Sequence, residues 1–119
     1  MAVVKKGNFC VECKECRTWF SWMKGLMFSK LHEREGLLFV FPHERNVDIH
    51  MLFVFFPLDI LWLDGKGRVV SLVRKAKPFT LFVKGKRAGY LLEVRGGVAD
   101  RLRVGDNLTI KLKREKTSL

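Results

Sequence analysis

Three cysteines near the beginning of the chain have a spacing that metal sites use. Cys10, Cys13 and Cys16 form a C-x2-C-x2-C run, and thiolates at this spacing can surround one soft metal ion. The chain has no fourth cysteine, so a histidine or a carboxylate would have to complete the site. On a β-strand, Cys10 and Cys13 would also point to opposite faces. We therefore expect the three cysteines to act as small apolar residues that stay reduced and bind no metal or other cofactor. A structural protein stabilised by a metal is kept as an alternative.

Three titratable side chains stand within apolar segments, namely His50, Asp59 and Glu93. A buried carboxylate without a partner is strongly unfavourable. Asp59 is therefore expected to accept backbone N–H bonds or to pair with an arginine, in preference to lining a pocket. If the three side chains converge, they could act as acid and base in a hydrolase-like enzyme. No nucleophile elbow, phosphate loop or metalloprotease motif accompanies them, so this enzyme is the second alternative.

The positive charge of the chain is concentrated in one segment. The formal net charge is +11, and the segment Gly65–Leu92 contains no Asp or Glu. Its basic side chains are Lys66, Arg68, Arg74, Lys75, Lys77, Lys84, Lys86 and Arg87. Phe79, Phe82 and Tyr90 lie among them, and cations beside aromatic rings suit a single strand of nucleic acid. A solvated basic face is the simpler interpretation, so we predict only weak, sequence-independent binding to polyanions.

Short apolar runs separated by turn residues predict the elements that position these side chains. A short helix is expected at Trp19–Lys24 and a helical turn at Val98–Leu102. Pro42 is expected to end the strand Leu37–Phe41. These elements predict a mainly β fold, a small sandwich or barrel of about seven or eight strands with one or two short helices. The predicted strands are Phe9–Cys13, Leu37–Phe41, Val47–Phe56, Asp59–Leu63, Arg68–Val73, Phe79–Val83, Ala88–Val94 and Asn107–Leu112.

Length and composition indicate one domain with a substantial core. The chain has 119 residues, of which 48% are hydrophobic, and we expect a single domain over residues 1–119 with a frayed basic tail from residue 113. No secretory signal is recognisable, so a cytoplasmic location is expected. Pro57 and two carboxylates interrupt the most apolar stretch, which argues against a membrane span. The predicted core contains Leu38, Val40, Met51, Phe53, Ile60, Trp62, Leu92 and Val94.

Several short motifs occur in an order and spacing that point to a known family. They are Gly25-Leu26-Met27, Gly36–Pro42, Ile49-His50-Met51, Pro57–Ile60, Leu92-Glu93 and Gly105-Asp106. With them the chain resembles the domain-of-unknown-function 192 family (uncharacterised protein family 0127) in its archaeal form. The resemblance implies a mainly β domain with small helices and an unknown function. Absence of Gln and abundance of Lys and Arg are typical of hyperthermophile proteins.

Functional chemistry is not carried over from that family. Its bacterial members tend to have Trp-Met-Lys-Asn where this chain has His50-Met51-Leu52-Phe53, so polar residues there are replaced by apolar ones. We expect an uncharacterised, noncatalytic binding or accessory module. Its contact surface would be the basic segment Lys66–Arg87, with a shallow pocket near Asp59.

Overall fold

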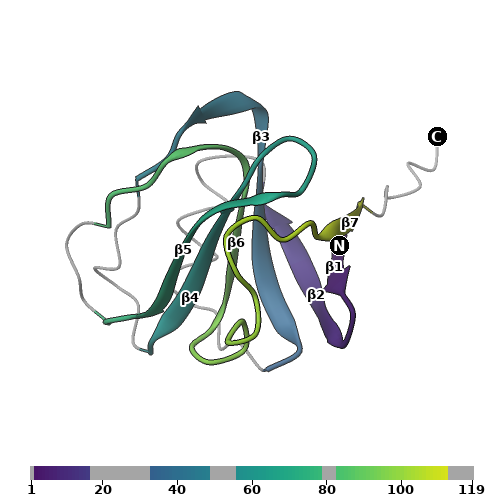
Figure 1. The fold of residues 1–119 in the computed structure, drawn as a ribbon, viewed down its shortest axis with the longest axis vertical. Helices are drawn as coiled ribbons and strands as arrows, with labels where there is room; N and C mark the ends of the chain where they lie inside the picture. Colours follow the sequence, from purple (N-terminus) through teal and green to yellow (C-terminus); the bar gives the residue numbers. More distant parts are fainter. Residues whose placement is uncertain (1, 17–32, 49–55, 79–82, 113–119) are drawn as a thin grey trace.

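The computed structural model describes residues 2–16, 33–48, 56–78 and 83–112. Within these ranges the chain forms seven β-strands and no helix (Figure 1), which confirms the prediction of a mainly β protein. The strands are β1 (Ala2–Lys6), β2 (Phe9–Cys16), β3 (Glu35–Asn46), β4 (Leu58–Leu63), β5 (Val69–Ala76), β6 (Arg87–Arg95) and β7 (Thr109–Leu112).

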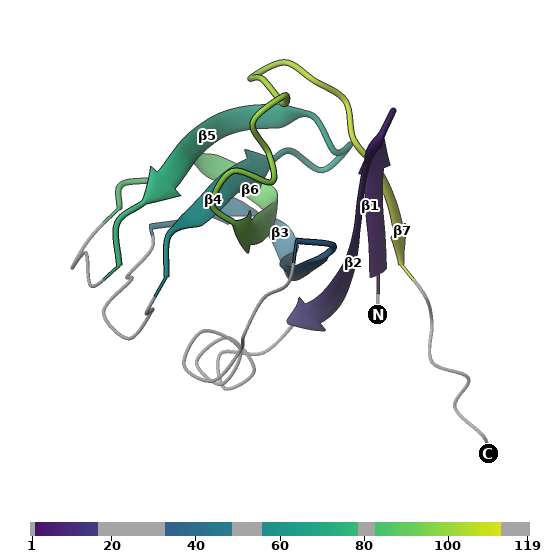
Figure 2. The same cartoon turned by 90° about the horizontal axis from the view of Figure 1, so that it is seen from below.

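All seven strands belong to one strongly curved sheet, in the order β5-β4-β6-β3-β2-β1-β7. Neighbours are antiparallel except β2 and β3, which run parallel. In Figure 2, β5, β4, β6 and β3 form one arm of the curve, β2, β1 and β7 form the other, and the segment before β7 crosses between them. There Val69 N–H donates to Asp106 O at 2.8 Å and Leu108 N–H donates to Gly67 O at 2.9 Å. The architecture is thus a single curved sheet whose edges approach each other, neither a two-layered sandwich nor a closed barrel.

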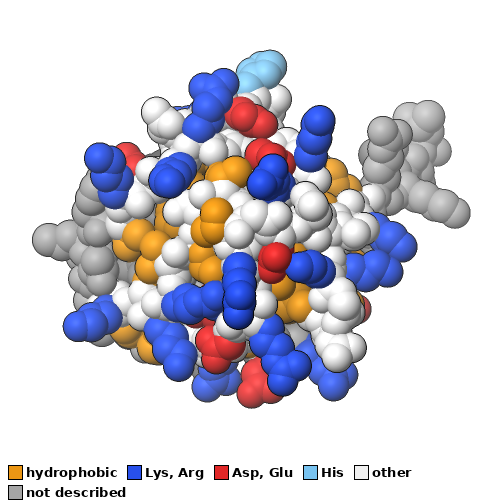
Figure 3. Space-filling model, in the orientation of Figure 1, with side chains coloured by type: hydrophobic (Ala, Val, Ile, Leu, Met, Phe, Trp, Pro, Cys, Tyr) orange, Lys and Arg blue, Asp and Glu red, His pale blue; other side chains and the backbone are white. Residues whose placement is uncertain are grey.

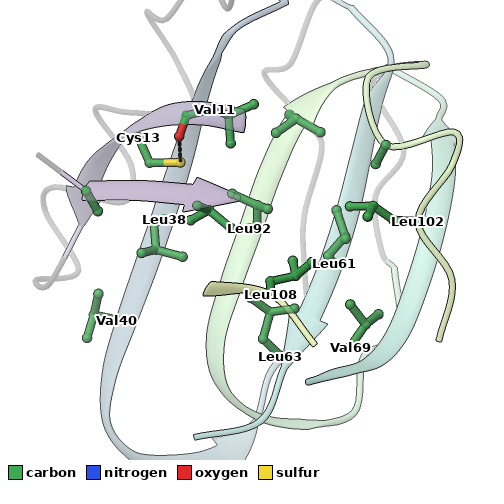
Figure 4. Close-up of a cluster of buried hydrophobic side chains, with 14 residues drawn as sticks. Val11, Cys13, Leu38, Val40, Leu61, Leu63, Val69, Leu92, Leu102 and Leu108 are labelled. Atoms are coloured by element: carbon green, nitrogen blue, oxygen red, sulfur yellow. Dashed lines mark hydrogen bonds between the residues drawn. The ribbon is translucent and has the colours of Figure 1, made fainter. Parts of the chain in front are cut away.

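Strand alternation divides the buried side chains between the two faces of the sheet. The enclosed cluster, which includes Leu38, Leu61, Leu92 and Leu108, lies inside the curve (Figure 4). The outer cluster lies on the other face and includes Leu37, Phe39, Ile60, Trp62 and Leu91. The predicted core is confirmed for the six of its residues that the structure describes, whereas Met51 and Phe53 lie outside the described ranges. Those six are Leu38, Val40, Ile60, Trp62, Leu92 and Val94.

Two strands differ from the sequence-based prediction. Strand β1 was not predicted, although the Gly7-Asn8 turn with Gly7 at φ +56° joins it to β2 in a tight hairpin of the kind that needs glycine. The expectation that Pro42 closes its strand is wrong, since β3 continues to Asn46. Its pairing with β6 is irregular between Val40 and Arg45, and within such a bulge the missing N–H of Pro42 breaks no regular ladder bond.

Other predicted elements meet different outcomes. The predicted helical turn Val98–Leu102 is a succession of turns in which an N–H bonds the carbonyl three residues earlier, Val98 N–H to Arg95 O and Leu102 N–H to Ala99 O, both at 3.0 Å. The predicted helix Trp19–Lys24, residues 49–55 of the long apolar strand, residues 79–82 and the tail from 113 lie outside the described ranges. Among the described residues, no helix has the length and apolarity needed to cross a membrane.

Candidate functional sites

Asp59, in β4, is a buried carboxylate whose oxygens accept three backbone N–H groups. Its side chain is 0% exposed. Oδ1 accepts a hydrogen bond from Lys75 N at 2.8 Å, and Oδ2 accepts from Gly97 N at 3.0 Å and Ala99 N at 2.9 Å. Hydrogen bonds of this kind compensate the lost hydration of a buried charge. Of the roles expected for Asp59, the structure shows the acceptance of backbone N–H bonds.

A β-bulge explains why Asp59 finds a free donor in the neighbouring strand. Leu58 pairs with Ala76 and Ile60 with Val73, so one residue of β4 faces two of β5. The extra residue leaves the ladder irregular, and Lys75 adopts a φ of +48°. The Asp59 carboxylate takes the N–H that this irregularity frees. Sequence alone gave no signal for this bulge, because no glycine marks it.

The loop that Asp59 binds is also held by a cation from β5. The guanidinium of Arg74 donates Nη1–H to Ala99 O at 2.6 Å and Nη2–H to Leu102 O. Asp59 therefore holds N–H groups of the segment 97–102 and Arg74 holds its carbonyls. Arg74 was predicted as part of a polyanion contact, and these bonds also give it a structural role.

Glu93, in β6, is equally buried but has a different environment. Its side chain is 0% exposed, and neither carboxyl oxygen has a hydrogen-bond partner among the described residues. Ile60 and Leu37 lie directly opposite it on the two adjacent strands. Burial disfavours the charged form and raises the pKa of Glu93 from 4.5 to about 8.

The register shows that Asp59 and Glu93 do not face a common space. Asp59 is opposite Val94, and Ile60 is opposite Glu93. Residues directly opposite share a face, and successive residues alternate. Asp59 is therefore on the face of the enclosed cluster and Glu93 on that of the outer cluster, so they cannot act together on one bond. The third member of the candidate pocket, His50, lies outside the described residues.

The three thiols are also distributed over different environments. Cys10 is exposed, whereas Cys13 belongs to the enclosed cluster and Cys16 to the outer one. Burial raises the pKa of Cys13 to about 12 and that of Cys16 to about 11, which disfavours the thiolate that binds metal. Among the described residues, no group of three or more His, Cys, Asp or Glu side chains is placed to hold a metal ion.

The eight predicted contact cations do not form one patch. The register puts Lys66 and Arg87 near the Leu63 end of β4, and Lys75 and Lys77 near its Leu58 end. A six-residue strand separates these ends by roughly 17–20 Å. On the face seen in Figure 3, Lys and Arg side chains are spread over the surface and interspersed with Asp and Glu.

Three of these cations border a hollow of about 490 Å³, here called the basic hollow, near the start of β6. Two contacts shape it: Trp62 Nε1–H donates to Val47 O at 2.8 Å, and Gly85 N–H donates to Asp48 Oδ1 at 2.9 Å. A Cβ on Gly85 would lie 1.7 Å from Val47 O, so only glycine fits there. The lining residues are Asn46, Asp48, Val70, Lys84, Gly85, Lys86 and Arg87.

The cations of the basic hollow differ in how far they are neutralised. Arg87 Nε lies 3.7 Å from Glu44 Oε1, and Glu44 Oε2 also accepts a hydrogen bond from Gly65 N at 2.9 Å. No described carboxylate forms an ion pair with Lys84 or Lys86, and both are exposed. Two uncompensated ammonium groups therefore stand at the rim of a hollow that contains one carboxylate, Asp48.

The fold and these sites describe a small β protein whose described residues hold no recognisable catalytic constellation. The model of the domain-of-unknown-function 192 family (DUF192), described as "Uncharacterized ACR", matches residues 2–111. The chain belongs to this family, as its motifs predicted.

Similar proteins from thermophilic archaea carry the name of an uncharacterised protein family, UPF0127. The UPF0127 protein of Thermococcus sibiricus is 31% identical over 106 residues, which cover 86% of this chain and 68% of that protein. The UPF0127 protein of Pyrococcus furiosus is 32% identical over 110 residues, covering 89% and 92%. A Thermococcus kodakarensis relative is 36% identical over 89 residues, which span only 55% of its length.

Two crystal structures share the fold. One, from Sinorhizobium meliloti, is described as a candidate transcription regulator; it has a TM-score of 0.78 and 21% identity over 92% of this chain and 90% of that one. The other, a protein of unknown function from Novosphingobium aromaticivorans, has a TM-score of 0.76 and 27% identity, covering 91% and 82%. These similarities establish the fold and leave the activity open.

Proposed function

We propose that this chain is a single-domain, noncatalytic binding module whose basic hollow contacts the phosphates of a polyanion, with single-stranded nucleic acid as the first ligand to test. The observation that carries the proposal is the pair of unneutralised, exposed ammonium groups of Lys84 and Lys86 beside a hollow. Phosphate oxygens are strong acceptors for such groups, and counterion release favours the contact.

The proposed contact surface is smaller than the one expected from the sequence. Arg74 is engaged by loop carbonyls, and Lys75 and Lys77 lie at the far end of β5. The proposed surface therefore contains Lys84, Lys86 and Arg87, and Lys66 in the nearby β4–β5 turn extends it. The description of the Sinorhizobium structure guides the choice of nucleic acid as ligand, although 21% identity supports only the fold.

The enzyme alternative receives less support from the geometry. The carboxylate oxygens of Asp59 accept hydrogen bonds from backbone N–H groups, and Glu93 faces the other side of the sheet. A cytoplasmic location, expected from the sequence, is part of the proposal and would be tested by fractionation of the native cells.

Binding of a labelled single-stranded oligonucleotide at several salt concentrations tests the proposed surface. With about three phosphates contacted, the logarithm of the association constant should fall with the logarithm of salt concentration with a slope near −2. In the variant Lys84→Glu/Lys86→Glu, binding should fall by more than tenfold at low salt because attraction is replaced by repulsion. Circular dichroism should show an unchanged fold, since both side chains are exposed.

The matched control is Lys5→Glu/Lys14→Glu, which makes the same change in net charge on exposed residues of β1 and β2. It should retain most of the binding. Equal loss in both variants would mean that only net charge attracts the ligand, and the proposed surface would then be wrong. Absence of binding by the unmodified protein at low salt would also refute the proposal.

A further inference from the structure

A second and larger hollow, of about 670 Å³, lies at the other end of the sheet and is here called the arginine hollow. It is formed where β2 begins, β3 begins and β6 ends. Its lining residues are Asn8, Phe9, Cys10, Val11, Glu33, Arg34, Arg95, Gly96, Gly97 and Val98. Its volume is within the range usual for sites that take small molecules.

The backbone around the arginine hollow is held in place on three sides. Arg34 O accepts a hydrogen bond from Glu12 N at 2.8 Å, and Arg95 O accepts from Val98 N at 3.0 Å. The third side is the loop whose Gly97 N–H donates to Asp59 at 3.0 Å. Asp59 therefore does not line this hollow but positions one of its walls. A preformed wall reduces the ordering that a ligand would have to impose.

The charges in the arginine hollow favour an anion. Arg34 and Arg95 contribute two guanidinium groups against the one carboxylate of Glu33, and no described residue forms an ion pair with either arginine. Phe9 and Val98 also line the hollow, and each is partly buried. Guanidinium groups bind carboxylate and phosphate oxygens in bidentate fashion.

We propose that the arginine hollow binds a small organic anion. Its carboxylate or phosphate group contacts Arg34 and Arg95, and its apolar body rests on Phe9 and Val98. This site is separate from the basic hollow and does not depend on polyanion binding there. The two sites are distinguished by the substitutions that affect them.

Cys10 provides a built-in probe, because it lines this hollow and is the exposed one of the three thiols. Alkylation of Cys10 should be slowed by phenyl phosphate or phenylacetate and not by neutral benzyl alcohol. Comparison of phenyl phosphate with phenylacetate distinguishes a preference for phosphate from one for carboxylate. Cys13 and Cys16 are buried, and peptide mapping of the labelled protein would assign the reaction to Cys10.

A second measurement needs no ligand and detects the electrostatic attraction of Arg34 and Arg95 for an anionic reagent. Anionic iodoacetate should react with Cys10 faster, relative to neutral iodoacetamide, in the unmodified protein than in Arg34→Gln/Arg95→Gln. The ratio of the two rates should fall about three- to fivefold in this variant at low salt. Protection by phenyl phosphate should weaken by about tenfold or more in the same variant. Both arginines are exposed, so the fold should survive the substitutions.

The matched control is Lys84→Gln/Lys86→Gln, which removes two charges from the basic hollow and should leave Cys10 protection unchanged. Equal loss of protection in this control would show a nonspecific charge effect and overturn the proposal. The proposal would also be overturned if neither phenyl phosphate nor phenylacetate, up to about 10 mM, slowed the alkylation of Cys10. Absence of oligonucleotide binding by the unmodified protein would refute the basic hollow and leave the arginine hollow intact.

Discussion

Two buried carboxylates, one register position apart on adjacent strands, have opposite surroundings. Asp59 faces the enclosed side of the sheet and accepts three backbone hydrogen bonds. Glu93 faces the outer side among apolar neighbours, and none of the described residues donates a hydrogen bond to it. Both are 0% exposed. Burial alone therefore does not define the role of an acidic residue, because its hydrogen-bond donors decide whether the charged form is stabilised.

The difference arises from what each face of the sheet offers. The bulge in β5 and the loop after β6 bring free N–H groups to Asp59. Glu93 is paired regularly with Leu37 and Ile60, and no described residue donates a hydrogen bond to its carboxyl group. Asp59 is therefore a structural clamp, and burial favours the neutral form of Glu93 by raising its pKa. Three experiments test this comparison.

Replacement of Asp59 by alanine should cause the largest effect. Three backbone N–H groups in buried or partly buried hydrogen bonds would lose their acceptor, and we expect the free energy of unfolding to fall by roughly 3–5 kcal/mol. Chemical denaturation of the purified variant measures this loss. The exposed Asp100, in the same loop, supplies the control, and Asp100→Ala should change stability by no more than about 0.5 kcal/mol. A variant of Asp59 as stable as the unmodified protein would contradict the clamp.

The pH dependence of stability should reveal Glu93. Burial raises the pKa of Glu93 from the 4.5 of an exposed glutamate, as in the unfolded chain, to about 8 in the folded protein. Between these pH values the folded state holds a proton that the unfolded state has lost. The contribution of Glu93 to the free energy of unfolding is therefore fully present below pH 4.5. It falls by about 1.4 kcal/mol per pH unit as the pH rises and levels off above pH 8. Denaturant titrations at intervals from pH 5 to pH 9 measure the slope.

The variant Glu93→Gln should flatten that slope, since glutamine has no proton to lose. At pH 7 it should be more stable than the unmodified protein by on the order of 2 kcal/mol, after the penalty of burying the amide is subtracted. Glu12→Gln, at an exposed position of β2, is the matched control and should retain the slope. An equal slope in all three proteins would mean that Glu93 is ionised in the folded state.

The reactivity of the three thiols should show the smallest of these effects, and it tests which side chains are buried on each face of the sheet. Cys13 and Cys16 lie in the enclosed and outer clusters, and Cys10 is exposed. One thiol per chain should therefore react quickly with a thiol reagent in native buffer, and all three in denaturant. Cys13 and Cys16 should both react slowly in native buffer, because both are buried and burial raises the pKa of each thiol. Rapid native reaction of Cys13 would contradict its place in the core.

Several features of this protein were accessible from the sequence. Short apolar runs bounded by turn residues predicted β4, β5 and β6 to within a few residues, and Leu38, Trp62 and Leu92 are buried as expected. The motif order predicted the family, and the buried Asp59 was expected to need donors. These predictions succeed because side-chain period and burial are local properties of a strand.

Other features depended on contacts between distant residues. The separation of Asp59 from Glu93 follows from the register of β4 against β6, which a shift of one residue would have reversed. Likewise, the structure brings Arg74 to the carbonyls of Ala99 and Leu102, to which it donates hydrogen bonds. The sequence spacing of these partners carries no signal of their proximity.

The sequence by itself determined the fold class, the family, the positions of several strands and the excess of positive charge. Only the tertiary structure decided how that charge is divided between the two ends of the sheet, which carboxylate receives donors, and that Arg34 and Arg95 meet at one hollow. The physical reason is that hydrophobic period acts along a few consecutive residues, whereas pairing register, bulges and loop closure bring together groups far apart in the chain.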